Sequence, residues 1–301
     1  KVVKAHRVQK TFIFGLSRDR FGIIIMVLAV SQLSLMAVFV KMIGPSFHSS
    51  QIAFLRNLIA MIFIFPLLLK AGGIALLKTK RIKLHFFRAF SGVCGNILFF
   101  YSFQRLPLAD VIVISQAVPI FVTILAVWVL NEKVGWRRWL AVLIGFLGVT
   151  LAIQPSINFA LVSLYALAAT AFWATTILMM RLLGATESPF SVVFYFMLFG
   201  AVITGFAQPW VWRSPETEII FLIIGVGLTG ALGQLLMSYS LKLASASVVT
   251  PFNYTGIFWA IGFDIIFWGL VPSWYIIFGA ILITGSGIFI FRREAASLDK
   301  A

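Results

Sequence analysis

The sequence predicts an all-α membrane protein with ten transmembrane helices, arranged as two five-helix units in a 5+5 inverted-topology repeat. Composition is the first reason: the chain is 61% hydrophobic and only 11% charged, whereas soluble domains carry about a quarter charged residues. The second reason is that the apolar residues form segments long enough to cross a bilayer. The third is that motifs of the first half of the chain recur in the second half.

The apolar segments define the expected helices. A transmembrane helix needs about 20 predominantly apolar residues. Charged residues and Pro or Gly positions divide the chain into ten such segments, at 21–43, 50–69, 84–104, 109–131, 136–154, 159–183, 189–210, 218–241, 246–270 and 273–291. The connections are short, which indicates a compact helical bundle without soluble domains.

The placement of the 24 lysines and arginines predicts the orientation. With the N-terminus inside, nearly all of them fall on cytosolic segments, including the basic segment 1–20 and the tail 292–301, and only Arg105 and Arg213 fall on outer loops. Cytoplasmic loops are enriched in Lys and Arg. We therefore expect a multi-pass protein of the inner (plasma) membrane with both termini cytoplasmic, and we interpret the net charge of +15 as topology rather than nucleic-acid binding.

Two related stretches support the internal repeat. GNILFFYSF (95–103) resembles GQLLMSYSL (233–241), which aligns Asn96 with Gln234. The same alignment pairs Gly95 with Gly233, Tyr101 with Tyr239, Ser115 with Asn253 and Gln116 with Tyr254. The units are 21–154 and 159–291. Because each has an odd number of helices, the second enters the membrane upside down, as in many secondary transporters whose substrate site lies near the midplane.

Three stretches carry a family resemblance: FLRNLIA (54–60), YSFQRLPLADVIVISQAVPIFVTILAVWVLNEKVGWRRW (101–139) and PFNYTGIFWAIGFDIIFWGLVP (251–272). With these the chain resembles the drug/metabolite transporter superfamily, specifically its EamA-type ten-helix members. The resemblance implies export or exchange of small metabolites, with amino acids prominent among the substrates and the aromatic amino acid exporters as one candidate subgroup. One departure is that the second half has Gly269-Leu270 where the first has Asn131-Glu132.

Ionisable residues inside the spans are functional candidates, because charge in a bilayer is costly. Arg56 and Asp264 lie at similar depth near the outer ends of their helices, which allows an ion pair between them. Such a pair would fix helix packing or take part in gating or proton coupling, and both interpretations stay open. Lys41 is expected to extend to the outer interface and Arg88 to belong to the second cytosolic segment.

Polar and aromatic residues of the spans are candidates for substrate contact in a mainly apolar cavity between spans 1, 3, 4, 6, 8 and 9. Each has a structural alternative, namely hydrogen bonding between helices for the amides and packing or lipid contact for the aromatic rings. Pro119 and Pro251 interrupt their spans, either as hinges of a transport site or as ordinary kinks. The substrate-contact candidates are Gln32, Asn96, Tyr101, Gln116, Trp173, Gln234, Tyr239, Asn253 and Tyr254.

The sequence shows no motif typical of a metal site or of a nucleotide-binding site. No Cys/His cluster indicates a metal, and GVGLTG (225–230) lies inside an apolar span rather than in a nucleotide-binding βαβ unit. We expect no cofactor and no enzymatic activity. The predicted partners are a small-molecule substrate and the lipid bilayer, with no nucleic acid, and the chain is a monomer or homodimer.

The predicted function is that of a secondary-active or facilitative transporter working by alternating access. Export of amino acids or related zwitterionic or aromatic compounds is favoured. One alternative is import or exchange of another metabolite, such as a vitamin or a nucleoside-like compound. An intramembrane enzyme and a receptor-like membrane protein are alternatives of a different class.

Overall fold

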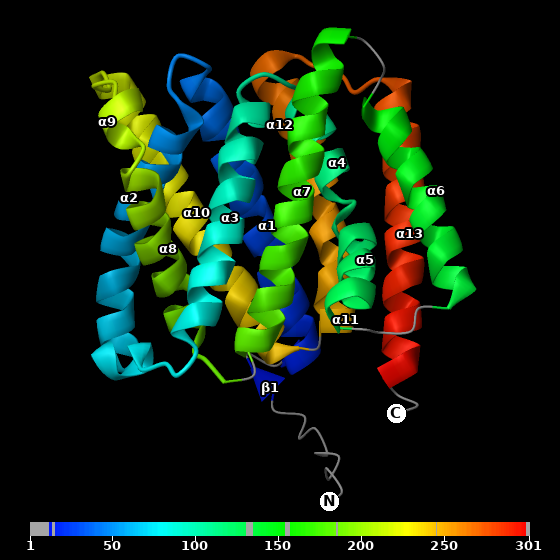
Figure 1. The fold of residues 1–301 in the computed structure, drawn as a ribbon, viewed down its shortest axis with the longest axis horizontal. Coiled ribbons are helices and arrows are strands. Elements are labelled where there is room, and N and C mark those ends of the chain that lie inside the picture. Colours follow the sequence, from blue (N-terminus) through cyan, green and yellow to red (C-terminus); the bar gives the residue numbers. More distant parts are fainter. Residues whose placement is uncertain are drawn as a thin grey trace, which may run out of the picture.

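The computed structural model describes residues 12–13, 16–130, 135–153, 157–184, 186–244 and 246–298, which fold into an α-helical bundle (Figure 1). The exception to the helical structure is a short antiparallel pair, β1 (Phe12–Ile13) and β2 (Leu16–Ser17), directly before the first helix. The predicted all-α class is confirmed. Most of the predicted segment 1–20, together with Glu132 and the last residues of the tail, lies outside the described residues.

The first part of the chain forms α1 (Arg18–Ile43), α2 (Ser49–Ala71), the 3-10 helix η1 (Gly73–Leu77), α3 (Ile82–Phe103), α4 (Leu108–Ser115), α5 (Val118–Leu130) and α6 (Trp136–Ile153). The second part forms α7 (Ile157–Gly184), α8 (Pro189–Gly205), α9 (Gln208–Val211), α10 (Thr217–Leu243), α11 (Ala246–Val249), the 3-10 helix η2 (Thr250–Tyr254), α12 (Thr255–Trp268) and α13 (Trp274–Leu298). By length and composition, 6 of the described helices can cross a membrane, and shorter apolar helices accompany them.

Three of the predicted spans are divided rather than continuous. Span 109–131 is α4 and α5, span 189–210 is α8 and α9, and span 246–270 is α11, η2 and α12. Proline explains two of these breaks, because it has no N–H to donate and its ring disturbs the preceding turn. Pro119 follows the gap between α4 and α5, and Pro251 lies inside η2. Both prolines therefore interrupt regular helix, as the sequence predicts.

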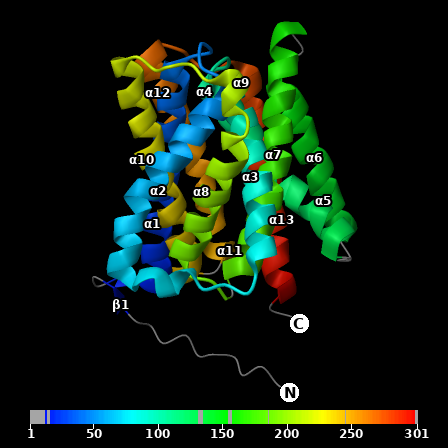
Figure 2. The same ribbon diagram turned by 60° about the vertical axis from the view of Figure 1, so that its left-hand side comes forward.

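The helices pack in pairs that join distant parts of the chain. The most extensive contacts are α1 with α10, α3 with α7, α6 with α13 and α2 with α8, and α4 contacts α12. Figure 1 shows that α1 begins and α13 ends at the same end of the bundle. In Figure 2, α2 and α10 lie on the left of the bundle and α6 on its right. Each half of the chain is therefore packed mainly against the other half.

Small residues set the spacing of α6 and α13, which form one edge of the bundle (Figure 1). A Cβ atom added to Gly279 would lie 2.8 Å from the carbonyl oxygen of Gly148 and 3.0 Å from Cβ of Ala152. Outward from this contact, Leu147 and Ile281 are exposed, as expected of side chains that face lipid. Close approach through small residues is a common way for membrane helices to associate.

We expect Gly279→Ala to lower the melting temperature of the protein in detergent, because the added methyl meets backbone atoms of α6. Overpacking of this kind costs about 1–3 kcal/mol. Gly285→Ala is the matched control on the same helix, since no atom lies within 4 Å of its added Cβ. Thermal unfolding of both variants checks the prediction. Equal melting temperatures would contradict the close contact between α6 and α13.

Candidate functional site

A cavity of about 160 Å³ lies inside the bundle, at the level of the breaks between α4 and α5 and around η2. Its lining comes from α1, α3, α4, α5, α7, α10 and η2, with Arg56 from α2 and Gly256 from α12. Most of the lining is aliphatic or aromatic, and Arg56 is the one charged side chain among the described lining residues. The cavity thus lies among the spans from which the sequence candidates were drawn, with one further contribution from α2.

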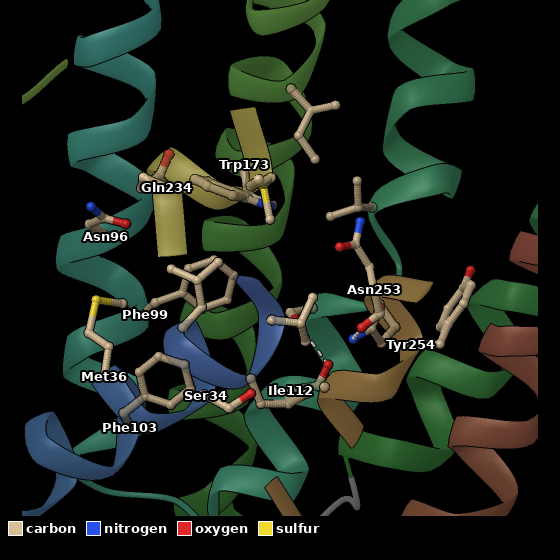
Figure 3. Close-up of a pocket in the computed structure, with 18 of the residues that line it drawn as sticks. Ser34, Met36, Asn96, Phe99, Phe103, Ile112, Trp173, Gln234, Asn253 and Tyr254 are labelled. Atoms are coloured by element: carbon tan, nitrogen blue, oxygen red, sulfur yellow. Dashed lines mark hydrogen bonds between the residues drawn. The ribbon is translucent and has the colours of Figure 1, made fainter. Parts of the chain in front are cut away.

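Two amides face one side of the cavity. Asn96 on α3 and Gln234 on α10 are almost fully buried, with 7% and 2% of their surface exposed. Both line the cavity, and Figure 3 shows them on the same side, with Trp173 and Phe99 next to them. Nδ2 of Asn96 has no hydrogen-bond partner among the described residues. The residue therefore lines the cavity, while this donor is buried without a partner and turned away from Gln234 (Figure 3).

The opposite side is built from the two helix breaks. Nε2 of Gln116, at the end of α4, donates to the carbonyl oxygen of Asn253 in η2 over 3.3 Å. Tyr254 is directed towards α13, because its hydroxyl oxygen occupies the space beside Gly287. Figure 3 shows Asn253 and Tyr254 on this side, across from Asn96. One hydrogen bond therefore joins the two interruptions on this side of the cavity.

Several sequence candidates lie outside the cavity lining. Tyr101 packs against Tyr165 with ring centroids 5.2 Å apart, and the guanidinium of Arg105 lies 3.7 Å from its ring. Tyr239 packs against Phe190 at 5.9 Å. The remaining candidates outside the lining are Gln32, Pro251 and Asp264. The aligned tyrosines are thus packing residues in this structure, although their neighbours Asn96 and Gln234 face the cavity.

The ion pair that the sequence allowed between Arg56 and Asp264 is not formed, and that prediction is wrong. Asp264 pairs with Lys41 instead. Oδ1 of Asp264 accepts from Lys41 Nζ at 2.7 Å, and its Oδ2 accepts from the backbone N–H of Ala109 at 2.8 Å. Ala109 lies in the first turn of α4, whose preceding residue, Pro107, gives no side-chain cap. Asp264 therefore caps α4 from another helix, where a carboxylate is favoured by the helix dipole.

Lys41 does not extend into the outer interface, which corrects the expectation for this side chain as well. Its ammonium group also lies 4.1 Å from the ring of Trp268. Only 12% of its side chain is exposed, against 2% for Asp264. The pair joins α1 to α12, so its identification required knowing which helices are neighbours.

Arg88 is buried in the bundle, and its assignment to a cytosolic segment is wrong. Its Nη1 donates to the carbonyl oxygen of Val192 at 3.1 Å, and its Nη2 to Oε1 of Gln234 at 3.4 Å. It lies well inside α3, which begins at Ile82. The polar spacing of His85, Arg88 and Ser91 along one helical face was the signal that could have revealed this position.

Arg56 is equally buried, and its Nη1 donates to Oδ1 of Asn57 at 2.9 Å. The ring of Phe196 on α8 lies beside both arginines, with its centroid 5.4 Å from the guanidinium carbon of Arg56 and 4.5 Å from that of Arg88. No carboxylate in the described residues lies within ion-pair distance of either guanidinium. The two arginines therefore lie close together in the interior without an acidic partner.

Comparison with known proteins identifies relatives along most of the chain. The sequence pattern of the EamA-like transporter family matches residues 20–154 and again 160–292. A riboflavin transporter of Vibrio cholerae is 32% identical over 253 residues, which covers 82% of this chain and 84% of that protein. The pseudopaline exporter CntI of Pseudomonas aeruginosa is 28% identical over 280 residues, covering 91% of this chain and 96% of the exporter.

An S-adenosylmethionine uptake transporter of Rickettsia bellii is 28% identical over 262 residues, covering 86% of this chain and 89% of that protein. One solved crystal structure superposes with a TM-score of 0.64 at 15% sequence identity, covering 91% of this chain and 98% of the other. At that identity the likeness concerns the fold alone.

We expect Lys41→Met and Asp264→Asn each to lower thermal stability more than the double variant does. Removing one partner of a buried ion pair leaves the other charge unpaired, which costs about 3–5 kcal/mol, whereas removing both avoids this penalty. Thermal unfolding of the two single variants and the double variant measures the coupling. The exposed Lys242→Met is the matched control. Additive effects of the two substitutions would show that the pair is not formed.

Proposed function

The chain belongs to the EamA-like transporter family, and from that premise we propose that it moves a small metabolite across the plasma membrane by alternating access. The observation that carries the proposal is the internal cavity, which is lined by amides and aromatic rings and lies where two helices are interrupted. In membrane transporters, interrupted helices at the midplane commonly form the substrate site.

The architecture in this proposal is ten spans in a 5+5 inverted repeat, with units 21–154 and 159–291. The two family matches, 20–154 and 160–292, support it. The helix pairing supports it too, because exchange of the two units turns the α1–α10 contact into the α7–α3 contact and leaves α2–α8 and α6–α13 unchanged. The break after Ser115 also aligns with the irregular segment at Asn253.

The proposed substrate is a small zwitterionic or aromatic metabolite, such as an amino acid or a related compound, and the proposed direction is export. The mixture of aromatic rings and uncharged amides in the cavity favours a flat or aromatic body with a few polar groups. Import of an aromatic vitamin is the second candidate, favoured by the 32% identity to a riboflavin transporter. The named relatives include both an exporter and an uptake transporter, so similarity does not decide the direction.

Asp264 and the two prolines have roles in the proposed transport cycle. The Lys41–Asp264 pair ties α1 to α12 and to the start of α4 at the predicted outer end of the bundle. Its release would let these helices separate and open the cavity outwards. The interruptions near Pro119 and Pro251 are the places where α4–α5 and α11–α12 would bend, because regular helix hydrogen bonding already ends there.

We predict that purified protein in proteoliposomes exchanges at least one labelled amino acid, aromatic metabolite or vitamin in a counterflow assay. Asn96→Leu and Gln234→Leu should reduce the exchange about tenfold or more, because loss of a hydrogen bond to a polar substrate group costs about 1–2 kcal/mol and each leucine also fills part of the cavity. Gln32→Leu and Tyr239→Phe are matched controls outside the cavity lining.

The controls should keep at least half of the wild-type exchange rate. Absence of exchange for every compound in the screen would contradict the proposed function. Equal losses in the cavity variants and in the controls would contradict the position of the site. Import and export are distinguished by measuring net flux with substrate on one side only of oriented vesicles.

A further inference from the structure

The arginine pair formed by Arg56 and Arg88 is the strongest feature that the proposed function leaves unexplained. Both side chains are buried, with 1% and 0% of their surface exposed. Each offers a planar group with several N–H donors and stays charged under ordinary conditions. Among the described residues, their partners are Asn57, Gln234, the carbonyl oxygen of Val192 and the Phe196 ring, all of them neutral.

This arrangement is unfavourable in the absence of an anion. Buried charges are normally paired, because their hydration is lost without compensation. The two guanidinium groups also repel each other, because both lie beside the ring of Phe196. Their carbon atoms are 5.4 Å and 4.5 Å from the ring centroid, and the distance between them cannot exceed the sum of these two distances. The Nε atoms of both arginines are buried and have no hydrogen-bond partner among the described residues. The pair therefore has unused donors and uncompensated positive charge.

One member of the arginine pair reaches the cavity. Arg56, Asn96 and Gln234 all line it, and Nδ2 of Asn96 lacks a partner as well. Gln234 connects this wall to Arg88, because its Oε1 accepts from Arg88 Nη2. An anionic oxygen group in the cavity could therefore bind against Arg56 while Arg88 contributes positive charge from behind Gln234.

We propose, resting on the transport function proposed above, that the substrate carries an anionic oxygen group, a carboxylate or a phosphate, which binds at the arginine pair. Guanidinium groups bind both kinds of anion through paired hydrogen bonds. The aromatic part of the cavity, with Trp173 and Phe99, then receives the remainder of the molecule. Because the described lining contains no carboxylate, a purely cationic substrate is disfavoured.

A second cavity, of about 210 Å³, lies on the other side of this pair. Val192, whose carbonyl oxygen accepts from Arg88, lines it, and so does Ser238, one helical turn beyond Gln234 on α10. Lys242 also belongs to its lining. Glu187 lines it too, so an ammonium group and a carboxylate both border this second cavity, and the proposed anion site is assigned to the central cavity alone.

The test compares four matched aromatic probes on the full-length chain in detergent: benzoate, phenyl phosphate, benzylamine and benzyl alcohol. Ligand-induced shifts in melting temperature give apparent affinities. We expect benzoate or phenyl phosphate to bind at least about tenfold more tightly than benzylamine and benzyl alcohol. The reason is that a hydrogen bond between a guanidinium group and an anion contributes about 1.5–3 kcal/mol. The benzoate and phenyl phosphate arms distinguish a carboxylate site from a phosphate site.

The variant Arg56→Gln should reduce this preference for the anionic probes to less than about twofold, and Arg56→Lys should reduce it in part. Arg105→Gln is the matched control, because Arg105 is exposed and lies outside the cavity lining. Asn96→Leu, which changes no charge, is a second test if Arg56→Gln does not fold, and it should weaken anion binding severalfold.

The proposal is overturned if the wild-type protein shows no preference for the anionic probes, or if Arg56→Gln or Asn96→Leu retains it in full. This outcome is distinct from failure of the transport function. Counterflow of neutral or cationic metabolites alone would sustain transport and reject the anion site. Preferential binding of the anionic probes without any counterflow would sustain the anion site and reject transport.

Discussion

Every polar group that this chain carries into the membrane must be satisfied inside the bundle, because lipid offers neither hydrogen bonds nor hydration. Most groups meet this constraint locally: Thr123, Thr170 and Thr204 donate to the carbonyl oxygen four residues earlier. Others meet it across helices, as Asp264 does by accepting from Lys41 and from the start of α4. These longer-range contacts join helices that are far apart in the sequence.

The same constraint explains why the breaks between α4 and α5 and around η2 lie beside the internal cavity. Interrupted helices expose backbone groups, and these are tolerated at membrane depth only where protein or a cavity surrounds them. Gln116 supplies one such contact by donating to the backbone of η2. The groups that remain unsatisfied then stand out. Nδ2 of Asn96 and the Nε atoms of Arg56 and Arg88 are buried donors without partners among the described residues, and Asn96 and Arg56 belong to the lining of the cavity.

The sequence predicted the positions of the helices better than the neighbours of individual residues. Apolar runs and prolines located the helices and their interruptions, since these depend on local composition. Whether a residue faces lipid, another helix or the cavity depends on the packing of distant segments. Asn96 and Tyr101 lie on the same helix, yet the first lines the cavity and the second packs on Tyr165. Arg88 was misassigned because a charged residue near the end of an apolar run resembles a loop residue.

The most direct test of the account is a structure determined with a metabolite that the protein exchanges. The account predicts the metabolite in the cavity between α1, α3, α7 and α10, with an anionic oxygen within hydrogen-bond distance of Arg56 or Asn96 and its remaining part against Trp173. A metabolite bound outside this cavity, or one whose charged group is turned away from the arginine pair, would contradict it.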